Sequence, residues 1–169
     1  VNLLRLSRGN MKVAVLMLFA VTAFLSMWIS NTATAAMMLP LAMGMMSHLD
    51  QEKERKTYVF VLLGIAYCAS IGGLGTVVGS PPNMIAAKAL NLDFVGWMKL
   101  GLPMMLLILP LMLFSMYVIL KPNLNERVEV KAESIPWTLH RVIALLIFLA
   151  AAVAWVFSSK IKEAFGISN

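Results

Sequence analysis

Long stretches without a charged residue constrain this chain more than any other feature. They cover residues 13–46, 57–87, 100–120 and 142–159. A helix rises about 1.5 Å per residue, so about 20 apolar residues are enough to cross the hydrocarbon core of a bilayer. Apolar residues make up 60% of the chain and charged residues only 13%. This composition excludes an ordinary soluble domain and predicts an all-α, polytopic helical membrane protein.

The basic residues flank the apolar stretches, as the orientation of membrane helices requires. They gather in the segments 5–12, 53–56 and 121–141, which we therefore place on the cytoplasmic side. These flanks explain the net charge of +6, so nucleic acid is not an expected partner. The single Cys68 lies inside an apolar stretch, which excludes a disulfide framework within the chain and favours a small buried side chain.

The stretch 13–46 has basic residues at both ends, so both ends should lie on the same side of the membrane. It is too long for one comfortable crossing and too short for two crossings with a turn. We expect a re-entrant hairpin of half-membrane helices at 13–29 and 33–46, with its tip near Ser30–Thr32. A secretory signal peptide is the alternative, because a basic start, an apolar run and small residues also fit one.

The stretch 57–92 is expected to be a broken membrane helix. Residues 72–83 read GGLGTVVGSPPN, and Gly and Pro at such density end a helix. Irregular backbone at membrane depth is tolerated only where protein buries it or where it lines a cavity. The stretch 100–120 then crosses back, and 142–159 crosses outward again.

Both breaks have the residue types that start helices. Ser30, Asn31 and Thr32 are capping types, and Ser80 precedes prolines that suit a first helical turn. The unpaired N–H groups of two helix starts attract an anion, and the carbonyl oxygens before each break suit a small cation such as Na⁺. No Asp, Glu or His lies inside the apolar stretches, which favours sodium coupling or anion exchange over proton coupling.

The apolar stretches lack the residue combinations that enzyme active sites use. They contain no paired carboxylates, no nucleophile with a base and no cluster of metal ligands. Lys88 is the only charge deep in the stretch 57–92, and we expect it to reach to the membrane interface. The alternative for Lys88 is a role in attracting substrate.

Two segments resemble the divalent anion:sodium symporter family, whose INDY-like members carry succinate, other dicarboxylates, citrate or sulfate. SNTATAAMMLPLA at 30–42 resembles the family's first Ser-Asn-Thr hairpin tip, and SIGGLGTVVGSPPNMIA at 70–86 resembles its unwound fifth helix. With the surrounding spans, the likeness covers nearly the whole chain. It implies a sodium-coupled, multi-pass carrier of the inner (plasma) membrane that works by alternating access and forms a homodimer.

The resemblance also implies roles for individual residues. The residues implied to bind one carboxylate of the substrate are Ser30, Asn31 and Thr32. The residues implied to hold sodium, through backbone carbonyls and the Asn side chain, are Ser26, Ser30, Asn31 and Gly79. The residues implied to border the same site are Ser80 and Pro81.

The chain departs from the family pattern toward its C-terminus. Family members carry a second Ser-Asn-Thr hairpin and a second broken helix in an inverted repeat, and this sequence contains neither. We therefore expect residues 1–120 to be the first-repeat transport portion, 121–141 a cytoplasmic linker, and 142–169 the first span of a truncated second repeat. By this interpretation the chain is the N-terminal half of a longer carrier.

The leading hypothesis is a fragment of a sodium-coupled transporter that imports di- and tricarboxylates such as succinate. A sodium-independent carboxylate exchanger, or a carrier of sulfate or another oxyanion, is the alternative among transporters. A non-transporting structural fragment from a truncated gene is the alternative of another class.

Overall fold

Helices make up most of the part of the chain that the structure describes. The structure is a computed structural model, and it describes residues 10–125 and 139–158. The elements in chain order are α2 (Met11–Ser26), α3 (Asn31–Met45), α4 (Arg55–Gly72), the 3₁₀ turn η1 (Gly73–Gly75), α5 (Pro81–Ala89), α6 (Phe94–Leu120) and α7 (Leu139–Val156). The predicted all-α class is confirmed for these residues.

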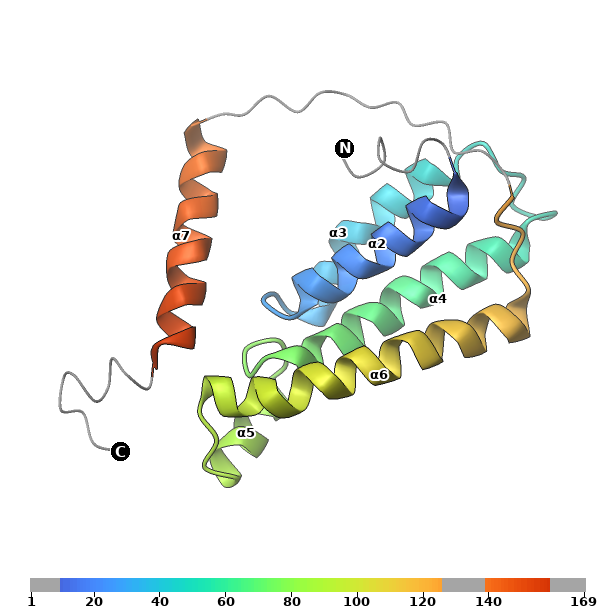
Figure 1. Cartoon of the computed structure of the whole chain (residues 1–169). Helices are drawn as coiled ribbons and strands as arrows, with labels where there is room; N and C mark the ends of the chain where they lie inside the picture. Colours follow the sequence, from blue (N-terminus) through green and yellow to red (C-terminus); the bar gives the residue numbers. More distant parts are fainter. Residues whose placement is uncertain (1–9, 126–138, 159–169) are drawn as a thin grey trace.

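Helices α2 and α3 form an antiparallel pair, here named the α2–α3 hairpin, with its turn at residues 27–30 (Figure 1). Helices α4 and α6 run antiparallel to each other beside this hairpin, and α5 lies next to the start of α6 (Figure 1). The start of α2, the end of α3, the start of α4 and the end of α6 share one end of the bundle. The hairpin therefore enters and leaves the bundle at the same end. Its placement in a membrane stays a prediction.

Small residues allow α2 and α4 to approach each other closely. The Phe19 ring meets the Phe60 ring edge to face, with centroids 5.6 Å apart. A Cβ on Gly64 would overlap the Phe19 ring, and a Cβ on Gly72 would overlap the backbone of Ala23. Glycine at such contacts is typical of helices that pack together inside membranes, where close backbone contact supplies much of the attraction.

The turn of the α2–α3 hairpin lies slightly earlier than the predicted tip at Ser30–Thr32. The Ser30 hydroxyl oxygen accepts a hydrogen bond from the Ala33 N–H at 3.3 Å, which makes Ser30 the N-cap of α3. Asn31 and Thr32 consequently belong to the first turn of α3 rather than to the loop.

Helix α6 is longer than predicted at its N-terminal end. It begins at Phe94 rather than near residue 100, because the Asp93 carboxylate accepts a hydrogen bond from the Gly96 N–H at 2.7 Å and caps the helix. Residues 94–99 are therefore the first turns of α6 rather than part of the connection that precedes it. Most of the predicted linker lies outside the described residues, at 126–138.

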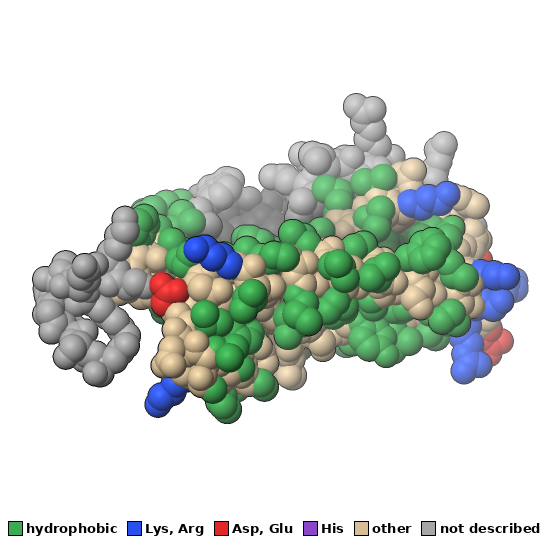
Figure 2. All heavy atoms as spheres, turned by 60° about the horizontal axis from the view of Figure 1, so that its bottom comes forward, with side chains coloured by type: hydrophobic (Ala, Val, Ile, Leu, Met, Phe, Trp, Pro, Cys, Tyr) green, Lys and Arg blue, Asp and Glu red, His purple; other side chains and the backbone are tan. Residues whose placement is uncertain are grey.

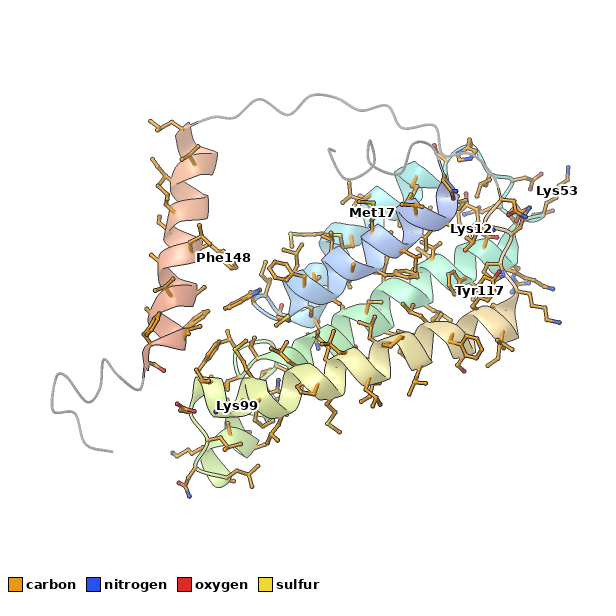
Figure 3. All side chains as sticks on the ribbon, viewed as in Figure 1. Lys12, Met17, Lys53, Lys99, Tyr117 and Phe148 are labelled. Atoms are coloured by element: carbon orange, nitrogen blue, oxygen red, sulfur yellow. The ribbon has the colours of Figure 1, made fainter. Side chains whose placement is uncertain are left out.

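The surface of the bundle has the pattern expected of a helical membrane protein. Apolar side chains cover its middle, and Lys and Arg side chains lie toward its ends (Figure 2). Lys12 and Lys53 lie at one end, and Lys99 lies at the other (Figure 3). Two helical segments, Arg55–Gly75 and Phe94–Leu120, are long and apolar enough to cross a bilayer.

Helix α7 stands apart from the bundle over most of its length (Figure 1). It meets the bundle through aromatic rings. Trp155 stacks on Trp28 with centroids 6.2 Å apart, and Phe148 meets Trp28 edge-on at 5.5 Å (Figure 3). Trp155 also stacks on Phe94 at 6.3 Å. These contacts place the C-terminal half of α7 beside the turn of the α2–α3 hairpin.

Candidate functional site

The turn of the α2–α3 hairpin and the break after α4 meet in space. The Ser26 hydroxyl, at the end of α2, donates to the Ala69 carbonyl near the end of α4 at 2.6 Å. Gly79, on the other side of the break, has no room for a side chain. If it carried a Cβ, that atom would lie 2.9 Å from the Ser26 carbonyl oxygen and 2.5 Å from the Gly73 carbonyl oxygen. The glycine thus allows irregular backbone to lie directly against the end of α2.

The Asn31 side chain lies between these two segments. One of its amide atoms is 2.7 Å from the Ser26 hydroxyl oxygen, 3.1 Å from the Ala69 carbonyl oxygen and 3.3 Å from the Gly79 carbonyl oxygen. The other amide atom faces only hydrogen-bond donors. The structure therefore brings together Ser26, Asn31 and Gly79, which the family resemblance assigns to one site although Gly79 is far from the other two along the chain.

Acceptor oxygens gather at this point because two helices end here. The Asn31 amide lies against the Ser26 hydroxyl at the end of α2 and the Ala69 carbonyl near the end of α4, and the Ala69 carbonyl also accepts from the Gly73 N–H. Ser26 is fully buried, so water does not compete freely for these oxygens. The described residues that form this cluster are all uncharged, so the cluster is neutral. Carbonyl, hydroxyl and amide oxygens are the ligands that a small hard cation prefers.

Thr76 ties the break to the hairpin, a role that the sequence did not predict. Its hydroxyl donates to the Met27 carbonyl and accepts from the N–H groups of Val78 and Gly79, at 3.2 and 3.1 Å. Thr76 is fully buried. One hydroxyl therefore fixes the turn of the hairpin and the backbone at Gly79 relative to each other.

Asn83 plays a similar part from the first turns of α5. Its side-chain N–H₂ group donates to the Gly73 carbonyl at 2.7 Å and to the Thr76 carbonyl at 2.8 Å, and the residue is 4% exposed. These bonds satisfy carbonyls that the break would otherwise leave unpaired. The sequence indicates this role of Asn83 only weakly, because a polar residue after two prolines is equally consistent with an exposed residue in the first turn of a helix.

The residues predicted to bind the substrate lie at the start of α3. Ser30 and Thr32 are exposed, and Asn31 between them is partly buried. The first N–H groups of α3 have no partner inside the helix and carry a partial positive charge, which suits an anion. Ser80 and Pro81 lie at the start of α5 as predicted, but the Ser80 side chain makes no capping hydrogen bond.

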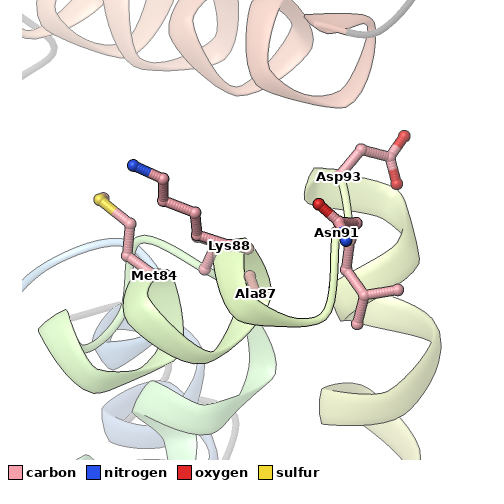
Figure 4. Close-up of a pocket in the computed structure, with 7 residues that line it drawn as sticks. Met84, Ala87, Lys88, Asn91 and Asp93 are labelled. Atoms are coloured by element: carbon pink, nitrogen blue, oxygen red, sulfur yellow. The ribbon is translucent and has the colours of Figure 1, made fainter. Parts of the chain in front are cut away.

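A separate cavity lies beside α5, with a volume of about 610 Å³. Lys88, Asn91 and Asp93 are among the residues that line it (Figure 4). Lys88 is exposed in the last turn of α5, which keeps its charge at the surface. None of the residues that the sequence assigns to the site lines this cavity.

Comparison with known proteins decides the family. A family model described as "Citrate transporter" matches residues 1–167. The chain belongs to the citrate transporter family. The family and the relatives that match the chain are transporters rather than enzymes, as expected from the sequence. The resemblance to sodium-coupled anion carriers is confirmed at the level of the family.

Several known transporters are similar over most of the chain. An uncharacterized transporter of Haemophilus influenzae is 57% identical over 95% of the chain and 35% of its own length. An uncharacterized transporter of Methanocaldococcus jannaschii is 35% identical over 94% of the chain and 36% of its own length. The sodium-dependent dicarboxylate transporter SdcS of Staphylococcus saprophyticus is 27% identical over 80% of the chain and 30% of its own length. The chain thus spans about a third of the length of these relatives.

Proposed function

We propose that this chain carries the cation and anion site of a sodium-coupled transporter for di- and tricarboxylates such as succinate. The observation that supports this most is the cluster of oxygens around the Asn31 amide, contributed by Ser26, Ala69 and Gly79. A neutral set of oxygens suits Na⁺ better than it suits a proton, which requires a titratable group. The name of the staphylococcal relative, a sodium-dependent dicarboxylate transporter, supports the same assignment.

Sodium is a transported substrate in this proposal. Its ligands are the backbone carbonyls of Ser26, Ser30 and Gly79 together with the oxygens of Asn31. The anion binds on the other side of Asn31, at Ser30 and Thr32, where the start of α3 offers unpaired N–H groups. A carboxylate at this point needs no Arg or Lys, because the helix start itself supplies the positive potential.

The membrane placement follows from the charges. We place the end of the bundle that carries Lys12 and Lys53 in the cytoplasm, by the positive-inside rule. The α2–α3 hairpin is then re-entrant, and the site lies near the middle of the bilayer, where broken helices are tolerated because protein surrounds them. The protein is a multi-pass protein of the inner (plasma) membrane.

The division of the chain fits alternating access. Residues 1–120 act as the transport portion, 121–141 as a cytoplasmic linker, and 142–169 as the first span of a second repeat. In transporters built from inverted repeats, the site lies at the interface between the repeats. The assembled carrier functions as a homodimer.

Uptake of labelled succinate tests the function directly. The protein expressed from the complete gene is reconstituted in liposomes, and an inward Na⁺ gradient is compared with a choline gradient of equal strength. We expect uptake to be at least about tenfold faster with Na⁺, since binding couplings between two ligands commonly reach this size. An excess of unlabelled citrate should compete more strongly than an excess of sulfate.

Three results would contradict the proposal. Succinate uptake of equal rate in Na⁺ and choline, driven by succinate loaded on the opposite side, would identify an exchanger. Competition by sulfate alone would identify an oxyanion carrier. A lack of uptake with every anion would leave only a structural role for this chain.

A further inference from the structure

The start of α6 lies against the break after α4. Trp97 donates from its indole Nε1 to the Leu74 carbonyl oxygen, in the middle of η1, at 3.0 Å. One turn further along α6, Gly101 is buried, and a Cβ there would overlap the same carbonyl oxygen. After another turn, Met105 is also buried, and its Sδ lies 3.2 Å from the position that a Cβ on Gly75 would take. Residues four apart share one face of a helix, so α6 presents this face to η1 over successive turns.

The turn η1 also contacts the α2–α3 hairpin. A Cβ on Gly73 would lie 3.1 Å from Asn31 Cγ, and a Cβ on Gly75 would lie 3.0 Å from Met27 Cγ. Leu74 is the residue between these two glycines, so the carbonyl that α6 holds lies between both contacts with the hairpin. A shift of η1 along α6 would therefore move it relative to Asn31, around which the proposed cation ligands gather.

Trp97 and Gly101 act together on η1. Trp97 supplies the Leu74 carbonyl with a donor from outside the broken helix. A Cβ on Gly101 would lie 3.1 Å from the Trp97 indole nitrogen, so the glycine leaves the room in which the N–H reaches its acceptor. A hydrogen bond has a preferred direction as well as a distance, whereas apolar contact alone has no direction and would let η1 slide along α6. The two residues therefore fix where η1 lies on α6.

We propose that Trp97 and Gly101 are positioning residues that hold the break in the geometry that binds the cation. The inference rests on the proposed function and adds residues of α6 that lie outside the predicted set of ligands. When the support from α6 is weakened, only a fraction of the molecules has the oxygens in place before Na⁺ arrives. The apparent affinity for Na⁺ then falls in proportion to that fraction, while saturating Na⁺ restores the geometry and with it the rate of uptake.

Trp97→Phe tests the proposal, because it keeps an aromatic ring and removes the N–H. The protein from the complete gene is reconstituted in liposomes, and uptake of labelled succinate is measured over a series of Na⁺ concentrations. We expect the half-saturating Na⁺ concentration to rise about fivefold or more, since the Leu74 carbonyl loses its donor. The maximal rate at saturating Na⁺ should stay close to that of the wild type.

Gly101→Ala approaches the same contact from the other residue. Its Cβ would displace the Leu74 carbonyl, so the half-saturating Na⁺ concentration should rise in this variant too. This variant also serves if Trp97→Phe does not yield a monodisperse, helical protein. Trp155→Phe is the matched control, because the described contacts give the indole N–H of Trp155 no acceptor. It should keep the half-saturating Na⁺ concentration of the wild type.

Amide hydrogen exchange in detergent supplies a readout that does not depend on transport. In Na⁺-free buffer, we expect the N–H groups of residues 73–79 to exchange faster in Trp97→Phe than in the wild type, and saturating Na⁺ should slow them again. A residue that only stabilised the fold would instead speed exchange throughout the bundle, and Na⁺ would not reverse the change at the break alone.

The outcomes separate this inference from the proposed function. A wild type whose succinate uptake ignores Na⁺ contradicts the proposed function itself. A sodium-dependent wild type, combined with an unchanged half-saturating Na⁺ concentration in both Trp97→Phe and Gly101→Ala, overturns only the positioning role. A fall in maximal rate and in unfolding temperature without a change in half-saturating Na⁺ overturns it as well, because the two residues would then only stabilise the fold.

Discussion

Replacing Gly79 by alanine is expected to abolish sodium-dependent succinate uptake. A Cβ at this position would lie 2.5 Å from the Gly73 carbonyl oxygen and 2.9 Å from the Ser26 carbonyl oxygen, and both are backbone atoms that cannot swing aside. The break must therefore shift away from the end of α2, which separates the oxygens of the cation site. Overpacking of this kind costs about 1–3 kcal/mol, which corresponds to a loss of affinity of about fivefold to 150-fold.

Gly44→Ala is the matched control for this variant. Gly44 also belongs to the α2–α3 hairpin, but a Cβ there would meet nothing within 4 Å. Alanine favours a helix by about 1 kcal/mol relative to glycine, so this variant should fold at least as well as the wild type. Equal uptake by both variants would show that the close contact at Gly79 does not matter for transport.

Replacing Thr76 by valine is expected to loosen the junction between the hairpin and the break. Valine keeps the shape of the side chain but removes the hydroxyl, which leaves the Met27 carbonyl without its donor and the N–H groups of Val78 and Gly79 without their acceptor. Each buried polar group that loses its partner costs about 1–3 kcal/mol. We expect a clear fall in the thermal unfolding temperature in detergent and a loss of most sodium-dependent uptake.

Thr76→Ser separates the hydroxyl from the methyl group. Serine keeps the hydrogen bonds and loses only packing, so it should retain most of the uptake that Thr76→Val loses. If the two variants were equally impaired, the methyl group would be the important part of Thr76, and its role in positioning the break would be contradicted.

The sequence predicted the elements of the candidate site better than it predicted how they are held. Glycine and proline density located the break at 72–83, and the helix-capping types of Ser30 and Ser80 located the starts of α3 and α5. Both are local signals, because a helix must end where its backbone cannot continue. The proximity of Asn31 and Gly79 came from the resemblance to a family, and the geometry agrees with it.

The hydrogen bonds that hold the site could not be predicted from the residues alone. Thr76 and Asn83 bond almost entirely to backbone carbonyls and N–H groups, which nearly every residue possesses, so no partner can be read from the sequence. The start of α6 was missed for a related reason, since the hydropathy of the span begins near residue 100 while its cap is Asp93. Capping is decided by one side chain and leaves little trace in hydropathy.

The central claim is that the turn of the α2–α3 hairpin lies against the break after α4, and disulfide formation tests it most directly. A Cβ on Gly75 would lie 3.0 Å from Met27 Cγ, which is where Met27→Cys would place its sulfur atom. In a Cys68→Ala background, we expect Met27→Cys with Gly75→Cys to oxidise readily and so resist labelling by a maleimide until reduced. Gly44→Cys with Gly75→Cys should remain fully labelled. Full labelling of both pairs under oxidising conditions would contradict the account, because the two breaks would then not meet.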